Sequence, residues 1–195
     1  MAPNYKSTLR ACYLGYIGQA IVNNLAPLLY VVFQTQYDIS FEMIGRLALF
    51  NFVTQLIVDI LAVKVVDRIG YRKPAVLACG ASFLGLVLLG VLPQVMPTPF
   101  IGLAISVMVY AVGGGLMEVL VSPIVDSLPS EDKASSMSLL HSFYSWGQMG
   151  VILISTLLLR VIGQAWWPVL PILWSLLPLY NLFAFLRAPL RPTVE

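Results

Sequence analysis

Long apolar runs separated by short polar connections make up most of the chain. The stretch from Ala11 to Tyr37 contains no charged residue, and neither does the stretch from Pro74 to Met117. The second stretch is interrupted by three prolines within residues 93–99, which no helix can accommodate, so it is expected to form two helices. A helix needs about 20 mostly apolar residues to cross the hydrocarbon core of a bilayer. The pattern therefore predicts six membrane-spanning helices, at about 9–35, 41–66, 74–94, 99–126, 134–160 and 165–187.

The composition agrees with a membrane location for these helices. Hydrophobic residues make up 59% of the 195 residues and charged residues 10%, whereas soluble domains carry about 45–50% and about 25%. This balance excludes a soluble enzyme, a disordered chain and a nucleic-acid binder, and the net charge of +2 is too small to indicate a polyanionic partner. Because lipid offers no hydrogen-bond partners, each segment must satisfy its own backbone, so we expect an all-α integral membrane fold.

Basic residues predict the orientation of these helices. Most of them fall on connections at one side of the expected membrane: Lys6, Arg10, Lys64, Arg68, Arg72, Lys73, Lys133, Arg187 and Arg191. Only Arg46 and Arg160 fall near the other side. Cytoplasmic connections carry the excess of lysine and arginine, so both termini are expected in the cytoplasm of a multi-pass cell-membrane protein. The first apolar run is too long for a signal peptide and is expected to be retained.

One acidic residue lies near the middle of the expected fourth helix. Glu118 follows the glycines at 113–115 and comes one turn before Ser122 and Pro123. A charge at the bilayer centre costs about 2.5–3.5 kcal/mol on insertion scales, so its presence needs a reason. Apolar surroundings favour the neutral acid, which ionises when water or a partner reaches it. A proton-coupled carrier needs this chemistry; the alternative is a protonated glutamic acid that only bonds a neighbouring helix.

Polar side chains share one face of the expected fifth helix. His141, Tyr144, Ser145 and Gln148 are spaced three, four and seven residues apart, so they lie on one side of the helix. Such a face within a membrane helix should line a water-filled cavity rather than lipid. The imidazole of His141 can relay protons near neutral pH or donate hydrogen bonds to a hydroxylated ligand. A bond between helices alone is the structural alternative.

Amide side chains form similar stripes on the expected first and second helices. They recur at helical spacing and comprise Gln19, Asn23, Asn24, Asn51 and Gln55, and Asp59 continues the second stripe. Amides both donate and accept hydrogen bonds, which suits a polyol such as a sugar. Amides also join membrane helices to one another, so each residue alone is ambiguous. Polar faces on four helices together indicate a shared central cavity.

The connection after the expected second helix resembles a family signature. It reads Asp67-Arg68-Ile69-Gly70-Tyr71-Arg72-Lys73, which is similar to the G-x-x-x-D-R/K-x-G-R/K-R/K loop of the major facilitator superfamily. The leading glycine of that signature is replaced here by Val63. A loop that only anchors the chain through positive charge would need neither the aspartate nor the glycine.

Further stretches resemble the fucose-permease-like branch of sugar:proton symporters in that superfamily. They are Asn23-Asn24-Leu25, the run from Gly113 through Glu118 to Pro123, and the region of His141, where the branch carries a polar amide. The helix-1 aspartate of the branch has no counterpart, because Ala26 and Pro27 occupy its place. We therefore expect Glu118 to carry the proton, with Asp59 and His141 as further candidates. The expected solute contacts are Gln19, Asn23, Asn24, Asn51, Gln55, Tyr144 and Gln148.

The resemblance also implies an architecture. It consists of two three-helix units of inverted topology that face a second six-helix bundle across a site at the membrane midplane. Residues 1–187 would form the N-terminal half of such a twelve-helix carrier, and residues 188–195 would begin the cytoplasmic linker. The chain would then be a fragment, a truncated product or one of two assembling copies. The gate of this half is expected to be a charge latch at the cytoplasmic side, formed by Asp67, Arg68, Gly70, Arg72, Lys73 and Asp126.

These features predict secondary transport of a small polar solute, sugar-like and proton-coupled. The expected partners are the bilayer, the solute, protons and the missing half or a second copy, with no nucleic acid, metal or cofactor. The alternatives are an exporter of drug-like or other metabolites and a non-transporting truncated subunit. An enzyme is not expected, because Cys12 and Cys79 lie in apolar runs and His141 and Ser142 point about 100° apart on a helix.

Overall fold

Six long helices joined by short connections form the protein. The computed structural model describes residues 5–129 and 132–190, and of Asp67 it describes the backbone alone. The helices are α1 Lys6–Tyr37, α2 Phe41–Ile69, α3 Arg72–Val95, α4 Pro99–Ser127, α5 Lys133–Ile162 and α6 Val169–Arg187, with a 3₁₀ turn, η1 Gln164–Trp166, before α6. All six helices are long and apolar enough to cross a membrane. This confirms the predicted all-α membrane fold.

Local sequence signals set several helix ends. The side chains of Ser40 and Asp132 each accept a backbone N–H from the first turn of the following helix, α2 and α5, as polar N-cap residues commonly do. Gly70 ends α2 with a φ of 76°, and Gly163 ends α5 with a φ of 89°. Glycine adopts this left-handed region at little cost, which gives the glycine of the family-like loop a structural reason.

The last helix begins later than the sequence predicted. The expected start at residue 165 was wrong, because the chain first turns through η1 and α6 begins only at Val169. Pro168 has no N–H with which to continue the bonds of that turn. In the same connection the side chain of Trp167 is fully buried, and its Nε1 donates to Oε1 of Gln36 at 2.8 Å. The connection therefore docks on the far end of α1.

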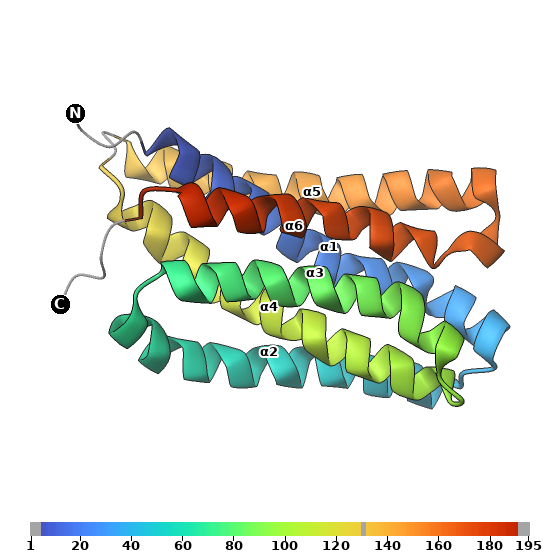
Figure 1. Cartoon of the computed structure of the whole chain (residues 1–195). Coiled ribbons are helices and arrows are strands. Elements are labelled where there is room, and N and C mark those ends of the chain that lie inside the picture. The colour runs from blue at the N-terminus through green and yellow to red at the C-terminus, as the bar shows by residue number, and fades with distance from the viewer. Residues whose placement is uncertain (1–4, 130–131, 191–195) are drawn as a thin grey trace.

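The helices run roughly side by side, and α1 begins at the same end of the bundle at which α6 finishes (Figure 1). α4 packs against α1, α2 and α3, and most of its central window is buried. α1 also packs against α5, α4 packs against α2, and α3 and α6 pack together. Exchanging α1–α3 with α4–α6 preserves these pairs. The packing thus agrees with two three-helix repeats of inverted topology.

A polar layer separates two apolar clusters along the bundle. Each cluster takes buried side chains from all six helices; one includes Phe33 and Leu89, the other Cys79 and Leu120. Between them along the helices lie buried polar residues: Gln19, Asn51, Gln55, Ser82, Ser175 and Asn181. A chain that crosses a bilayer with this arrangement holds its polar side chains near mid-depth.

Candidate functional site

A cavity of about 310 Å³ lies between α1, α4 and α5. It is lined by Tyr16, Gln19, Asn23, Glu118, His141 and Tyr144. The three residues from α1 are spaced three and four apart, so a single stripe of that helix faces the cavity. The sequence had identified every lining residue except Tyr16. Its spacing continues the stripe of Gln19 and Asn23, and that spacing was the signal that could have found it.

The carboxylate of Glu118 is held by a buried amide. Nε2 of Gln19 donates to Oε2 of Glu118 at 2.8 Å. Gln19 is 4% exposed, whereas Glu118 is exposed towards the cavity. The pair therefore fixes the carboxylate at the wall while leaving it open to a ligand.

Aromatic rings surround this carboxylate on the α5 side. The ring of Tyr16 lies 5.6 Å from the ring of His141 and 6.0 Å from that of Tyr144, centroid to centroid. The hydroxyl groups of Tyr16 and Ser122 lie 3.2 Å apart. His141 is exposed at the cavity. These contacts fix two phenol groups and one imidazole around the same opening.

Two of the predicted solute contacts lie behind the cavity wall. Asn51 and Gln55 on α2 are 8% and 6% exposed. Nε2 of Gln55 donates to Oδ1 of Asn23 at 2.8 Å and to Oδ1 of Asn51 at 3.2 Å. Asn23 in turn reaches the hydroxyl of Tyr144 at 3.4 Å. The structure therefore places Asn51 and Gln55 where they orient Asn23, because the packing of α2 against α4 turns them inward.

Two further predicted contacts lie beside the cavity. Nε2 of Gln148 on α5 donates to Oδ1 of Asn24 on α1 at 3.2 Å, and Asn24 donates to the carbonyl of Ala20 at 2.8 Å. Neither amide belongs to the cavity lining. Their contact joins α1 to α5 next to the opening.

Asp59, the second acidic candidate, lies apart from the cavity. It faces the glycine run of α4, and a Cβ placed on Gly115 would lie 3.1 Å from its Oδ1. This oxygen is buried and has no hydrogen-bond partner among the described residues. A role for Asp59 in proton coupling stays a prediction.

The family-like loop between α2 and α3 contacts the end of α6. The guanidinium of Arg72 donates to the carbonyl oxygens of Leu186 and Ala188. Arg68 and Lys73 are exposed, and the side chain of Asp67 lies outside the described residues. Arg72 thus acts on the open carbonyls of a helix end, where a cation is favourable.

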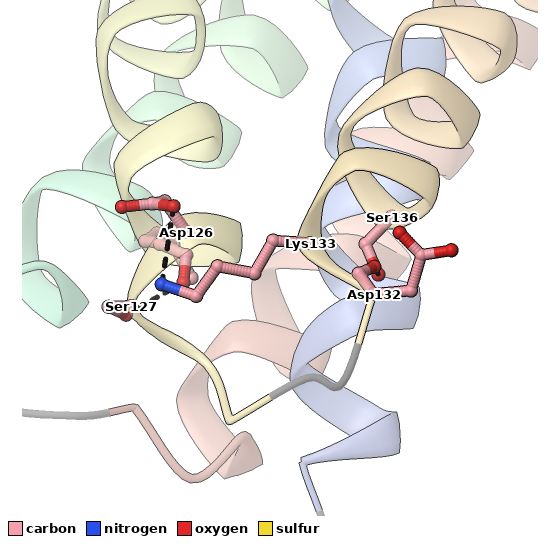
Figure 2. Close-up of polar contacts among 6 residues, drawn as sticks. Asp126, Ser127, Asp132, Lys133 and Ser136 are labelled. Carbon is pink, nitrogen blue, oxygen red and sulfur yellow. Dashed lines mark hydrogen bonds and ion pairs between the residues drawn. The ribbon is translucent and has the colours of Figure 1, made fainter.

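Asp126, the distal member of the predicted latch, contacts a different element. Its Oδ1 lies 3.4 Å from Nζ of Lys133, so the ion pair spans the connection from α4 to α5 (Figure 2). Within residues 5–129 and 132–190, Asp126 forms no ion pair other than the one with Lys133. The predicted latch that joins Asp126 to the loop of Asp67 and Arg72 stays a prediction.

The geometry describes a bundle of six membrane-length helices with a polar cavity between α1, α4 and α5, and a family comparison identifies its class. The family model of the Major Facilitator Superfamily matches residues 12–195. The chain belongs to this superfamily and is a membrane transporter of that class. No curated protein matches it. Among the described residues no three His, Cys, Asp or Glu side chains gather as metal ligands.

Proposed function

We propose that the chain forms the N-terminal half of a secondary carrier that takes up a small polar solute, sugar-like, together with protons. The observation that carries this proposal is the cavity between α1, α4 and α5, where one carboxyl group meets amide, phenol and imidazole groups. Secondary transporters bind their solutes near the membrane midplane, between repeats. The sequence resemblance to fucose-permease-like symporters supports the same class of solute.

The lining groups suit a ligand with several hydroxyl groups. Asn23 offers both an amide donor and an amide acceptor, and Tyr144 and His141 can each donate and accept. A cavity of about 310 Å³ lies at the small end of the usual range for ligand sites, about 300–1,000 Å³. The facing half would supply the rest.

Glu118 is the proposed proton carrier. Its Oε2 accepts from Gln19 at 2.8 Å, and the carboxylate is open to the cavity, so water can reach it in one state and be excluded in another. Exclusion of water favours the neutral acid. Proton binding would neutralise the carboxylate of Glu118 on the cavity wall. The ionisation of Glu118 would thereby be coupled to the conformational state of the carrier. His141 and Asp59 are the further candidates for this coupling.

The cavity requires a second bundle to close it. Exposed apolar side chains continue along α2 and α5, for example Phe52, Leu56, Trp146 and Leu153. We infer that the missing half, or a second copy of the chain, packs beside these helices and completes the carrier.

The substitution Glu118→Gln tests the proposed coupling in the assembled carrier. Thermal unfolding of the wild type is first measured against a panel of sugars and amphiphiles to find a stabilising solute. The variant should keep that stabilisation, because the amide preserves the hydrogen-bonding shape of the side chain. Its accumulation of the solute under a pH gradient should be abolished in proteoliposomes. Glu42→Gln is the matched control, because Glu42 is exposed and pairs with Arg46.

Each outcome of this experiment has a defined meaning. Normal accumulation by the Glu118→Gln variant would contradict the proton role. Stabilisation by amphiphiles but by none of the sugars would favour the drug-exporter alternative. A wild-type protein stabilised by neither class would count against a solute site in this cavity.

A further inference from the structure

A second pocket lies between the beginning of α1 and the end of α6. Its volume is about 270 Å³, and it is lined by Ser7, Arg10, Ala11, Leu14, Tyr180, Phe183, Ala184, Arg187 and Ala188. On α1, Leu14 and the cavity residue Tyr16 are two positions apart and therefore point about 200° apart. The pocket thus opens on nearly the opposite side of α1 from the solute cavity. Its role is independent of the proposed transport function.

Each wall of this pocket changes from polar to apolar in the same direction. On α6, Arg187 lies at the helix end, and Phe183 and Tyr180 follow one and two turns deeper. On α1, Arg10 precedes Leu14 by one turn. Seven residues of helix span about 10 Å, so a charged mouth continues into an apolar groove of about that length. Phe183 and Tyr180 are 52% and 66% exposed, which leaves their rings accessible from lipid.

The mouth of the groove carries positive charge that no acidic side chain of the described residues pairs with. Arg10 and Arg187 are both exposed, and neither has a hydrogen-bond or ion-pair partner among the described residues. Among the described residues that line it, none is acidic. Arg187 is not needed to cap its own helix, because Arg72 already bonds the carbonyls of Leu186 and Ala188. Two like charges at one mouth favour an anion between them.

Hydrogen bonds between the two walls hold the groove in shape. Oγ1 of Thr8 donates to the carbonyl of Pro189 at 2.7 Å, and Nδ2 of Asn181 donates to the carbonyl of Ala11 at 3.1 Å. Ala11 and Ala188 at the floor are each 1% exposed. The groove therefore exists before a ligand arrives, which lowers the cost of binding.

We propose that the groove binds an anionic phospholipid, whose phosphate lies between Arg10 and Arg187 and whose acyl chain follows the apolar wall of α6. Guanidinium groups bind phosphate through paired hydrogen bonds. Basic pockets between transmembrane helices are known to take anionic lipid headgroups. The depth gradient of the walls distinguishes a lipid from a soluble phosphate, because a soluble anion would leave the aromatic wall unused.

Native mass spectrometry of the full chain in detergent tests this proposal. Palmitoyl-oleoyl phosphatidylglycerol and the phosphatidylcholine with the same acyl chains are titrated separately. The wild type should bind phosphatidylglycerol preferentially. The variants Arg10→Gln and Arg187→Gln should each lose about fivefold of that preference, and the double variant at least about tenfold. Arg160→Gln is the matched control, because Arg160 also lies in the last turn of a helix, α5.

Two further measurements test the lipid assignment if the double variant folds poorly. The Arg10→Lys/Arg187→Lys variant should keep more of the preference for phosphatidylglycerol than the double glutamine variant, because it retains both positive charges. Glycerol 3-phosphate should not displace the lipid from the wild type; displacement at equal concentration would indicate a soluble phosphate site and overturn the lipid assignment. An unchanged preference in a folded double variant, or an equal loss in Arg160→Gln, would also overturn it.

Discussion

Gly85 on α3 lies against the backbone of Tyr110 on α4. A Cβ at this position would lie 2.7 Å from Cα of Tyr110, closer than side-chain and backbone carbons approach in folded proteins. Backbone atoms cannot move aside as the tip of a flexible side chain can. The contact between α3 and α4 therefore depends on a glycine at this position.

The variant Gly85→Ala tests this dependence. The added methyl group must push α3 away from α4, and overpacking of this kind costs about 1–3 kcal/mol. We expect a lower thermal unfolding temperature in detergent. Gly150→Ala is the control, because nothing lies within 4 Å of a Cβ at that position. Equal unfolding temperatures for the two variants would show that α3 and α4 can separate without cost.

Residue spacing predicted most of the residues that line the cavity, but it did not separate them from the polar residues that only support a lining residue. Gln19, Asn23, Glu118, His141 and Tyr144 were recognisable because each is polar at a depth where polarity is costly. The packing of α2 determines whether an amide faces the cavity or supports a neighbour, as with Gln55, and one-dimensional spacing carries no information on that packing. The ion pair of Asp126 with Lys133 depends on the path of the connection between α4 and α5, which the spacing of polar residues along a helix does not specify.

At the scale of elements, Arg72 joins the start of α3 to the end of α6. Its guanidinium bonds the carbonyls of Leu186 and Ala188, which have no partners further along the helix. The family-like loop therefore stabilises the end of a helix that is more than one hundred residues away in sequence.

The variant Arg72→Gln should loosen that helix end. Loss of the bonds is expected to cost about 1 kcal/mol locally, so amide hydrogen exchange in residues 184–190 should be about fivefold faster. Hydrogen-exchange mass spectrometry measures this change. Arg68→Gln provides the control, because Arg68 is an exposed arginine in the last turn of α2, four residues before Arg72. The same acceleration in both variants would mean that only the loss of positive charge matters.

The existence of the six helices followed from the sequence, whereas some of their ends did not. A charge-free run that is long enough to cross a bilayer must satisfy its backbone hydrogen bonds without water. A helix does this within the run itself, so such runs predict helices. The start of α6 depended on where Trp167 docks on α1. Trp167 bonds Gln36 there, and the two residues are 131 positions apart in the sequence. A tertiary contact of that kind cannot be predicted from the local periodicity of hydrophobic and polar residues.

At the scale of the whole molecule, the cavity is open and the bundle has wide exposed apolar faces. The state of assembly therefore decides whether a second bundle completes the proposed carrier. If the proposed carrier is correct, protein extracted from its own membrane should have at least twice the 21.4 kDa mass of one chain. Native mass spectrometry in detergent distinguishes a homodimer from a longer parent chain. A monomer of this chain that binds solute with full affinity would contradict the need for a second bundle.

The distribution of charge along the bundle predicts its orientation in the membrane. Arg10, Arg72, Lys133 and Arg187 lie near the end of the bundle at which α1 begins and α6 finishes. A cytoplasmic location of that end stays a prediction from the excess of positive charge.

The close contacts of α4 have a consequence for movement. Gly113 lies against Ser82 on α3, and Gly115 lies against Gln55 on α2. Gly15 on α1 lies against Met117. Helices that meet at such short range cannot slide past one another without collision, because their packed surfaces have no free volume. Alternation of access would then require this bundle to rock as one rigid body, and the hinge would lie outside it.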